Sequence, residues 1–429
     1  MRRNNTYTAI DVGTSKVCTV IGRLELSGHL EILGVGLVPS RGMKKGMVSN
    51  LSEVADAAKE SIQQAELDAG IKVYSANVGL TGTHISSLNT IATLDNRDYD
   101  NPVNSRDIKK VLKASSEYSS VDVDDARVLH IIPRTYAVDG HWGIGDPTGM
   151  HTSTLAVETH VIQGSSAPID SLIKAVSQAQ VKVKGIMLEP LASAKAILAQ
   201  EELEMGVVVL DIGGGTSDMA VFLEGNIWHS KIIPVGGFQL TRDIAIAFNT
   251  SYNAAEEAKV IFGSVDPSGI DLDEEIELPG FVPGIHYDIS RQDLCSVLRD
   301  RIEELFNLVL LELKGCGLDA VPPGGIVITG GSAKIPGLVQ LVEEMAGKPV
   351  RIGVPSGIYG MPDDMHDPSF STALGLLIAD TENNGVNDWY ATSKVKNSGY
   401  VLRRMRRVLG LMASAKDRII SQLRRSHDE

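Results

Sequence analysis

The chain has 429 residues, of which 43% are hydrophobic, and its formal net charge is −14. Its length favours about two to four domains, and its acidity argues against a nucleic-acid partner, whose affinity would come from contacts to phosphates. Three cysteines without a CxxC spacing favour a reducing compartment. Because the sequence has neither a signal core nor an apolar run long enough to span a bilayer, we expect a protein that is neither exported nor membrane-spanning.

A glycine-rich turn follows the first predicted strand. Apolar residues from Tyr7 to Ile10 predict a buried strand, and the sequence Asp11-Val-Gly-Thr-Ser-Lys16 comes directly after it. Glycine leaves no Cβ in the way, so successive N–H groups can form a cradle for phosphate oxygens. Hydroxyls and a lysine add further donors. The candidate phosphate-binding residues of this turn are Asp11, Gly13, Thr14, Ser15 and Lys16.

Strands and helices then alternate up to residue 199. A helix over 50–69 is predicted by a cap at Asn50 or Ser52 and a stop at Gly70. The loop-rich stretch 85–162, with a predicted helix at 105–119 and strands near 128–132 and 155–162, is interpreted as an inserted subdomain. The other elements expected here are a strand region at 72–87, a helix at 167–180 and a helix at 190–199 that begins at Pro190.

A second turn of the same kind, Asp211-Ile-Gly-Gly-Gly-Thr-Ser-Asp218, follows the apolar run 206–210, and a third lies at 325–334. These could be ordinary turns, since Asp, Gly, Ser and Thr are what turns are made of. The pairing favours two loops that clamp a nucleoside triphosphate. Asp11 and Asp211 would suit a hydrated Mg²⁺, which takes only one or two carboxylates from a protein. The candidate phosphate-binding residues of the second turn are Asp211, Gly213, Gly214, Gly215 and Thr216.

The remaining pattern predicts helices, one acidic insert and a polar connection. The insert covers 266–283 and contains prolines. Residues 380–399 are polar and rich in asparagine, which predicts a flexible linker. Helices are expected to begin near Pro234 and to cover 253–262, 290–315, 337–346 and 371–379.

The C-terminal segment 400–426 is basic and amphipathic. Residues 400–425 contain seven arginines and one lysine against one aspartate. On a helix, Leu402, Met405, Leu409 and Met412 lie on one face and Arg403, Arg404, Arg406 and Arg407 lie opposite. Such a helix lies flat in a lipid interface, with its arginines at anionic headgroups. The alternatives are a helix docked on its own body or a calmodulin-like target helix, and neither accounts as well for the arginines and the linker.

Five of these segments resemble the fingerprint of the actin, Hsp70 and sugar-kinase ATPase superfamily. They are the two phosphate turns, the segments 186–196 and 372–379 as connecting helices, and the segment 327–334 as the adenosine motif. The resemblance implies an α/β fold of two duplicated halves around a nucleotide cleft that holds ATP and Mg²⁺. It adds Gly330, Gly331 and Ser332 at the adenosine, Gly236 and Gly237 to the cofactor-binding set, and Glu256 and Lys259 at the ribose and adenine. Glu256 and Lys259 could equally form an ordinary i,i+3 salt bridge.

The same resemblance gives Glu189 a catalytic position beside the attacking water, which suits phosphoryl transfer by positioning. A glutamate before a proline can also simply cap a helix. We find no His-Asp dyad or other strong base committed to the cleft, and therefore expect at most slow ATP hydrolysis.

Over essentially its whole length the chain resembles the bacterial cell-division proteins of the FtsA family, on segments such as 129–139, 146–150 and 234–237. The resemblance implies subdomains 1A (1–84, with 163–195 and 356–379), 1C (85–162), 2A (196–243, with 312–355) and 2B (244–311). It also implies that the protein polymerises on the cytoplasmic face of the membrane at the division septum and tethers FtsZ there. The FtsZ tail would bind in 2B near Arg301. The other implied partners are further copies of this chain, anionic lipids and other divisome proteins. A solvated helix charge explains Arg301 equally well.

Other functions within the superfamily fit less well. A small-metabolite kinase would need an acidic base aimed at a substrate pocket in the first half, and a chaperone would need a peptide-binding domain after residue 380. The type IV pilus actin homologue is the nearest rival, and the amphipathic tail disfavours it.

Overall fold

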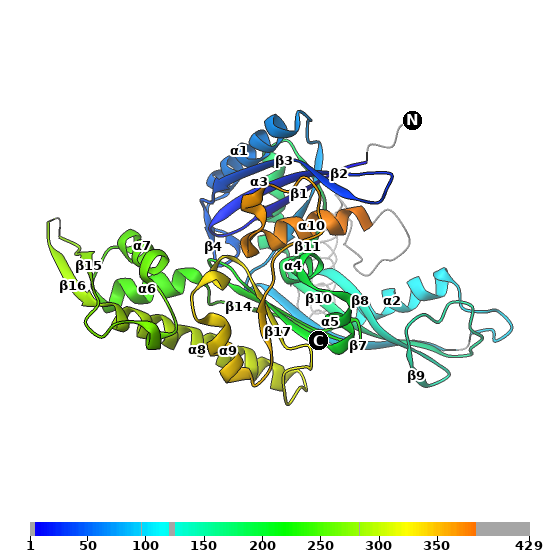
Figure 1. Cartoon of the computed structure of the whole chain (residues 1–429). Helices are drawn as coiled ribbons and strands as arrows, with labels where there is room; N and C mark the ends of the chain where they lie inside the picture. The colour runs from blue at the N-terminus through cyan, green and yellow to red at the C-terminus, as the bar shows by residue number, and fades with distance from the viewer. Residues whose placement is uncertain (1–4, 96, 120–124, 283, 383–429) are drawn as a thin grey trace, which may run out of the picture. The chain divides into compact units, whose positions relative to one another are not determined.

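A computed structural model describes residues 5–95, 97–119, 125–282 and 284–382 (Figure 1). The chain divides into two compact units, Met1–Ser393 and Lys394–Glu429. All described residues belong to the first unit. The predicted membrane helix over 400–426, with Leu402, Arg403 and their neighbours, therefore lies outside the described residues, as does most of the expected linker.

The first half is built on a five-stranded sheet with the strand order β11-β6-β1-β2-β3. The strands β1, β2 and β3 form an antiparallel meander, whereas β6 and β11 run parallel to β1. Nearly every residue of β1 is buried, as expected for a strand that helices cover on both faces. The strand bounds are β1 Thr6–Val12, β2 Lys16–Leu24, β3 Leu30–Pro39, β6 Ser75–Leu80 and β11 Lys182–Leu188.

The second half repeats this sheet. Its strand order is β14-β13-β12-β17-β18, again a meander followed by two parallel strands. The two sheets therefore have the same topology, which confirms the duplicated halves. The bounds are β12 Val207–Ile212, β13 Ser217–Leu223, β14 Asn226–Ile233, β17 Ile326–Thr329 and β18 Val350–Ile352.

Helices cover both faces of the first sheet. Gly34 of β3 faces helix α1, where an added Cβ would lie 2.6 Å from the Ala65 carbonyl oxygen. Gly34 pairs with Ile21, so the next residue of β2, Gly22, points to the other face and approaches Leu377 of α10. The predicted cap of α1 is confirmed, because the Asn50 side chain accepts hydrogen bonds from the backbone N–H groups of Ser52 and Glu53. The bounds are α1 Leu51–Ala69, α3 Ser166–Gln178, α4 Glu189–Ile197 and α10 Ser371–Glu382.

The two connecting helices, α4 and α10, cross at very close range. A Cβ at Gly375 of α10 would lie 1.8 Å from the carbonyl oxygen of Ala192 in α4. Helix α10 also extends three residues into the segment that we expected to be linker. There Asp380 is buried and pairs with Lys184, and Glu382 pairs with Lys195. The linker prediction is wrong for 380–382, because these ion pairs hold the end of the helix on the first half.

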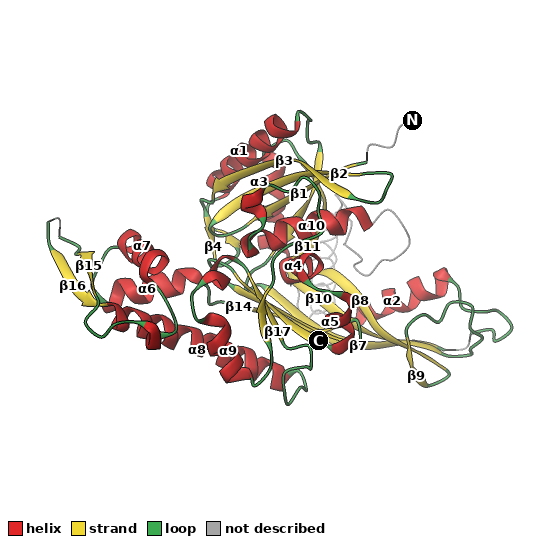
Figure 2. Cartoon of the chain, in the orientation of Figure 1, coloured by secondary structure: helices red, strands yellow, loops and turns green. Residues whose placement is uncertain are grey.

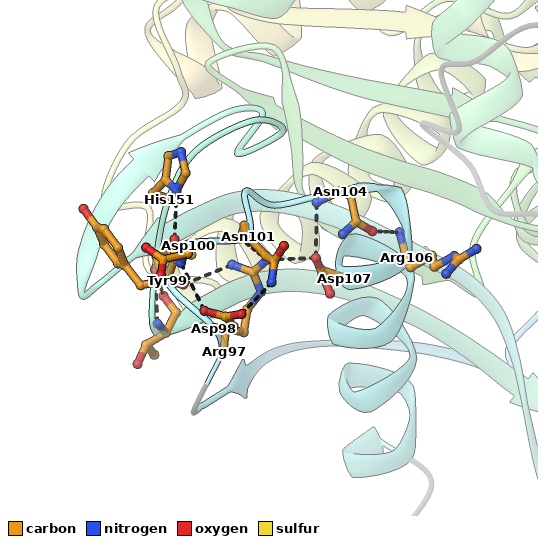
Figure 3. A network of polar contacts seen from close by, with 11 residues as sticks. Arg97, Asp98, Tyr99, Asp100, Asn101, Asn104, Arg106, Asp107 and His151 are labelled. Carbon is orange, nitrogen blue, oxygen red and sulfur yellow. Dashed lines mark hydrogen bonds and ion pairs between the residues drawn. The ribbon is translucent and has the colours of Figure 1, made fainter.

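The inserted block forms a four-stranded sheet of its own, in the order β7-β10-β8-β9, with α2 packed on it. Ala92, Val111 and Tyr136 belong to a separate small core there. Figure 3 shows how a polar network orders its loops. The Arg97 guanidinium donates to the carbonyl of Thr152 at 3.1 Å and pairs with Asp107 at 2.9 Å. The bounds are β7 Ile85–Leu94, α2 Ser105–Ser119, β8 Ala126–Val138, β9 His141–Ile144 and β10 Leu155–Ser165.

The second half carries a further layer in which α6, α7 and α8 gather beside a two-stranded hairpin (Figure 2). One strand of this hairpin lies inside the acidic insert, for which the sequence predicted no strand. The bounds are α6 Gly237–Ala247, α7 Tyr252–Phe262, β15 Glu275–Pro279, β16 His286–Ser290 and α8 Arg291–Gly315. Smaller elements are β4 Met43–Lys44, β5 Met47–Val48, α5 Gln200–Met205, α9 Leu338–Ala346 and the 3-10 turns Pro267–Gly269, Gly331–Lys334, Asp363–Met365 and Pro368–Phe370.

Candidate nucleotide site

A cavity of about 460 Å³ lies where the two halves meet, within the size range of small-molecule sites. Residues from β1 and β2 line one side, and residues from β12, α6 and α7 line the other. The sequence-predicted residues that line it are Asp11, Gly13, Thr14, Ser15, Lys16, Glu189, Asp211, Gly213, Gly214, Gly215, Thr216, Gly237, Glu256, Lys259, Gly330, Gly331 and Ser332.

Of the predicted cofactor-binding residues, all of which are described, Gly236 alone does not line the cavity. It packs behind the second glycine turn, where an added Cβ would lie 2.8 Å from the Gly213 carbonyl oxygen and 2.9 Å from the Thr216 nitrogen. The absence of a side chain at Gly236 lets α6 approach the back of the turn. Gly236 therefore supports the turn from behind, and its contact with a ligand stays a prediction.

The two glycine turns meet across the cavity. A Cβ placed on Gly214 would lie 3.5 Å from the Cβ of Ser15, and one on Gly215 would lie 2.8 Å from the Thr14 hydroxyl oxygen. Each turn closes a tight antiparallel pair, Val12 with Val17 in one half and Ile212 with Ser217 in the other. Equivalent backbone cradles from the two sheets therefore face one another, as the sequence predicted.

Four carboxylates gather beside these turns: Asp11 of β1, Asp211 of β12, Asp218 of β13 and Glu189, the first residue of α4. The pKa of Asp11 is raised to about 7, chiefly by burial, with Lys16 opposing the shift and the charge of Asp211 adding to it. The pKa of Asp218 is raised to about 7 and that of Glu189 well above its usual range, in both cases chiefly by burial and in part by neighbouring carboxylates. Without a cation, this cluster is held partly in its protonated form.

A hydrated Mg²⁺ fits the cluster. The described residues contain no group of three or more His, Cys, Asp or Glu arranged to ligate a metal directly. Magnesium usually keeps several waters and takes one or two carboxylates together with phosphate oxygens, so two opposed aspartates suffice. Asp218 is buried beside these two aspartates, and the Thr81 and Thr216 hydroxyls lower its pKa only in part.

Lys16 is the basic side chain at the first turn. Its ammonium donates to the Ser369 hydroxyl at 2.7 Å and lies 3.5 Å from the centre of the Phe370 ring. Burial lowers its pKa, although the nearby carboxylates oppose the shift. The ammonium is thus held by the segment just before α10.

The opposite end of the cavity holds Glu256 and Lys259 on α7. They form the i,i+3 ion pair, with Lys259 Nζ 2.7 Å from Glu256 Oε2, and both line the cavity. Lys259 also donates to the Thr241 hydroxyl at 2.8 Å. The salt bridge is therefore present, and both residues could still contact a ligand in the cavity. Gly330 is tightly enclosed, since a Cβ there would lie 2.3 Å from Oδ1 of Asp211.

Several residues of the cavity were not singled out in the sequence. Thr81 directly follows the parallel strand β6. Because ligands commonly bind at the carboxyl ends of parallel strands, its position in the sequence could have marked it as a site residue. Thr372 lies on the connecting helix α10, whose inward face had no motif that marked this hydroxyl. Ser193 of α4 is fully buried and does not line the cavity, and no motif marked its hydroxyl either. The other unpredicted lining residues are Phe238, Val260, Lys334, Ile335, Pro336 and Ser369.

Arg301, the predicted partner residue, lies on α8, away from the cavity. Its Nε donates to Asp243 of α6 at 2.5 Å, and its Nη1 pairs with Glu304 one turn further along α8. The side chain of Arg301 is 27% exposed. It therefore joins two helices and also reaches the surface.

Two sheets of identical topology, joined by crossing helices and facing glycine turns, define the actin-like class of ATPase folds. Solved structures share this fold. One is a chain of the PilM-PilN type IV pilus biogenesis complex, which is 16% identical in sequence and has a TM-score of 0.64. The match covers 89% of the present chain and 100% of the chain in that complex. MreB5 of Spiroplasma citri, in a structure with bound ADP, is 16% identical with a TM-score of 0.52 over 89% of this chain and 98% of MreB5.

Closer relatives identify the family. A model described as "Cell division protein FtsA" matches residues 208–375, and one described as "SHS2 domain inserted in FTSA" matches 82–163, the inserted block. FtsA of Pseudomonas aeruginosa is 39% identical over 86% of this chain and 88% of its own length. FtsA of Escherichia coli K12 is 37% identical over the same shares, and that of Borreliella burgdorferi is 34% identical over 94% and 97%. The chain belongs to the FtsA family of cell-division proteins.

Proposed function

We propose that the cavity binds ATP with Mg²⁺, with the phosphates between the two glycine turns. The observation that carries this proposal is the apposition of two equivalent backbone cradles, with Asp11 on one side and Asp211 on the other. The two aspartates would hold the metal through its waters, and Lys16 would leave Ser369 for a phosphate. The bound cation would neutralise charge on the phosphate oxygens.

Hydrolysis is expected to be slow. The superfamily resemblance implies a water-positioning place for Glu189, and the sequence commits no His-Asp dyad or other strong base to the cleft. In the ligand-free protein, burial and neighbouring carboxylates raise the pKa of Glu189. Bound Mg²⁺ would lower that pKa by opposing the negative charge. A rapid turnover that does not depend on protein assembly would contradict this expectation.

At the cellular level, we propose that this chain polymerises on the cytoplasmic face of the membrane at the division septum and tethers FtsZ there. The basic amphipathic sequence over 400–426 supports membrane attachment, since each basic residue near an anionic surface contributes about 1 kcal/mol. One copy would bind reversibly, and a polymer would gain avidity. Among the described residues, none of the helices has the length and apolar character that a bilayer crossing requires.

Sedimentation with anionic liposomes tests the tether. The full chain should pellet with the vesicles, and a chain that lacks residues 400–429 should stay in the supernatant. The matched variant Met405→Glu with Leu409→Glu keeps every arginine and interrupts only the apolar face. It should also fail to pellet. Equal pelleting of the truncated chain would exclude the anchor.

Arg301 gives a second test, directed at the FtsZ tail. Arg301→Glu should abolish binding of a peptide with the FtsZ C-terminal sequence in a fluorescence polarisation titration. Because Arg301 also pairs with Asp243, the variant Asp243→Asn serves as the control for loss of that ion pair. If both variants weaken binding equally, the arginine acts through the packing of α6 and α8, and the proposed contact with the peptide is wrong.

A further inference from the structure

Two buried hydroxyl groups hold one of the aspartates of the cavity. Ser193 of α4 donates a hydrogen bond to Oδ2 of Asp211 at 2.6 Å, and the Thr372 hydroxyl of α10 lies 3.1 Å from the same oxygen. The two hydroxyl oxygens are 2.9 Å apart. The exposed fraction is 0% for Ser193 and 7% for Thr372. The hydroxyls come from the two connecting helices, whereas the aspartate comes from the central strand of the second sheet.

The protons of these hydroxyls impose an order on the three groups. Each hydroxyl has one proton to donate. The shortest contact is that from Ser193 to Asp211, so the Ser193 proton lies there and the Ser193 oxygen is left to accept. Thr372 can then donate to Ser193 or to Asp211. Ser193 is therefore the principal donor, and Thr372 supports it.

Both hydroxyls bind the same carboxylate oxygen of Asp211, and neither binds the other oxygen. Both hydroxyls contact Oδ2, whereas Oδ1 lies against Gly330, where a side chain would come within 2.3 Å of it. A carboxylate that is fixed through one oxygen cannot rotate freely about its χ2 torsion. Its second oxygen is then held in one position.

We propose that Ser193 and Thr372 are positioning residues that orient Asp211, so that Oδ1 faces the water shell of nucleotide-bound Mg²⁺. This inference rests on the proposed binding of Mg·ATP. Outer ligands of this kind commonly set the affinity of a metal site by 10- to 100-fold. The two residues touch neither the metal nor the nucleotide in this scheme.

The same contact joins the metal site to the crossing of the two connecting helices. The separation of Ser193 and Thr372 is set where α4 and α10 approach most closely, with Gly375 against the Ala192 carbonyl. A shift of one helix along the other would separate the hydroxyls and release Asp211. Mg²⁺ at Asp211 should therefore favour the crossing seen here.

The test measures how much Mg²⁺ increases the affinity for ADP, which cannot be hydrolysed at a γ-phosphate. Isothermal titration of the full chain with ADP is done in excess Mg²⁺ and in excess EDTA, and the ratio of the two Kd values is compared. We expect Ser193→Ala to reduce this ratio by about tenfold, and Thr372→Val to reduce it less. Thr372→Ser keeps the hydroxyl and should restore the ratio. Binding of Mn²⁺ to the ADP complex, followed by electron paramagnetic resonance, should weaken in parallel.

Ser371→Ala is the matched control. Ser371 is also fully buried on α10 and bonds to Thr329 and to the Pro368 carbonyl, but not to Asp211. It should lower the melting temperature and leave the Mg²⁺ ratio unchanged. The inference is overturned if folded Ser193→Ala and Thr372→Val both keep the wild-type ratio, or if Ser371→Ala lowers it as much as they do. Thr372→Val alone decides the matter if Ser193→Ala does not fold. If the wild-type chain binds ADP without any gain from Mg²⁺, the proposed metal site itself fails, and this inference with it.

Discussion

Asp11, Glu189 and Asp218 carry carboxyl groups that burial makes hard to ionise. Each residue type is ordinary in a glycine turn or at a helix start, and it is their convergence that changes their chemistry. Asp218 is the clearest case, because the sequence places it at the end of the second turn without marking it as unusual. Its raised pKa follows only from its burial beside the other carboxylates.

The first prediction concerns the pH dependence of the ligand-free protein. The pKa of Asp218 rises from 3.8 to about 7 on folding, so its contribution to stability is complete below pH 3.8 and is lost as the pH rises through 7. Asp218→Asn removes that loss. The melting temperature of the variant should exceed that of the wild type at pH 8, and the difference should shrink towards pH 5.

The comparison with the wild type is needed because buried histidines act in the opposite direction. Burial lowers the pKa of His130 to about 4 and that of His160 to about 3, so their contribution is complete above pH 6.5 and falls as the solution is acidified. This contribution is common to both proteins and cancels in the difference. A difference in melting temperature that does not change between pH 5 and pH 8 would contradict the assignment to Asp218.

At the scale of elements, the crossing of α4 and α10 depends on Gly375. A Cβ at this position would lie 1.8 Å from the Ala192 carbonyl oxygen and 2.4 Å from the Ala192 carbonyl carbon. At least one of the two helices would have to move away from the other. Both helices are mostly buried and have little space to move apart. The glycine thus determines how closely the two helices pack.

The second prediction follows from this contact. Gly375→Ala should destabilise the protein by about 1–3 kcal/mol, as overpacking does in well-packed interiors, measured by urea unfolding. The matched control is Gly315→Ala at the end of α8, where an added Cβ meets nothing within 4 Å. That change should be neutral or slightly stabilising, because alanine is the better helix former. Equal stability of the two variants would show that the helices are not held at this distance.

The inserted block bonds to the second half through its own side chains. His160 of β10 contacts the Ser230 hydroxyl of β14 at 2.9 Å, and the Ser87 hydroxyl of β7 donates to the Ser230 carbonyl at 2.7 Å. The Arg134 guanidinium of β8 lies 3.7 Å from the centre of the Trp228 ring. The block therefore contacts the second half, although it is inserted in the sequence of the first.

The third prediction addresses these contacts. Ser230→Ala removes the hydroxyl that faces His160 in a fully buried setting, and should cost about 1–3 kcal/mol of stability. Urea unfolding measures the loss. Ser27→Ala, on an exposed turn, is the control and should change nothing. If Ser230→Ala is as stable as the wild type, His160 does not anchor the block to β14.

At the scale of the whole molecule, the apposition of the two glycine turns is the feature on which nucleotide binding depends. The fourth prediction tests it with a disulfide. The Cβ separation of 3.5 Å between Ser15 and a substituted Gly214 falls within the disulfide range. Ser15→Cys with Gly214→Cys should therefore cross-link under mild oxidation, seen as a mobility shift on non-reducing gels. Bound Mg·ATP should suppress the cross-link, because its phosphates would lie between the turns.

Ser15→Cys alone controls for reaction with the native cysteines, of which Cys18 and Cys295 are buried. A double variant that remains reduced under conditions where other engineered pairs oxidise would indicate that the turns stand apart. A cross-link that forms equally with and without Mg·ATP would place the phosphates elsewhere.

The sequence by itself determined the repeated strands, the glycine turns, the positions of most helices and the inserted block. These features depend on local physics: apolar periodicity, helix caps such as Asn50, and the small set of residues that tight turns accept. The same local rules led to the error at 380–382. Asp380 has the polar character of a linker residue, and only the structure shows that it is buried and paired with Lys184.

Only the tertiary structure decided which side chains meet. Ser193, Asp211 and Thr372 come from three separate segments, and no pattern within any one of them marks the hydroxyls as partners of the carboxylate. The supporting role of Gly236, the ion pair of Arg301 with Asp243 and the raised pKa of Asp218 are likewise invisible in the sequence. Each depends on burial and on distances between residues that are separated along the chain, and these arise only when the chain folds.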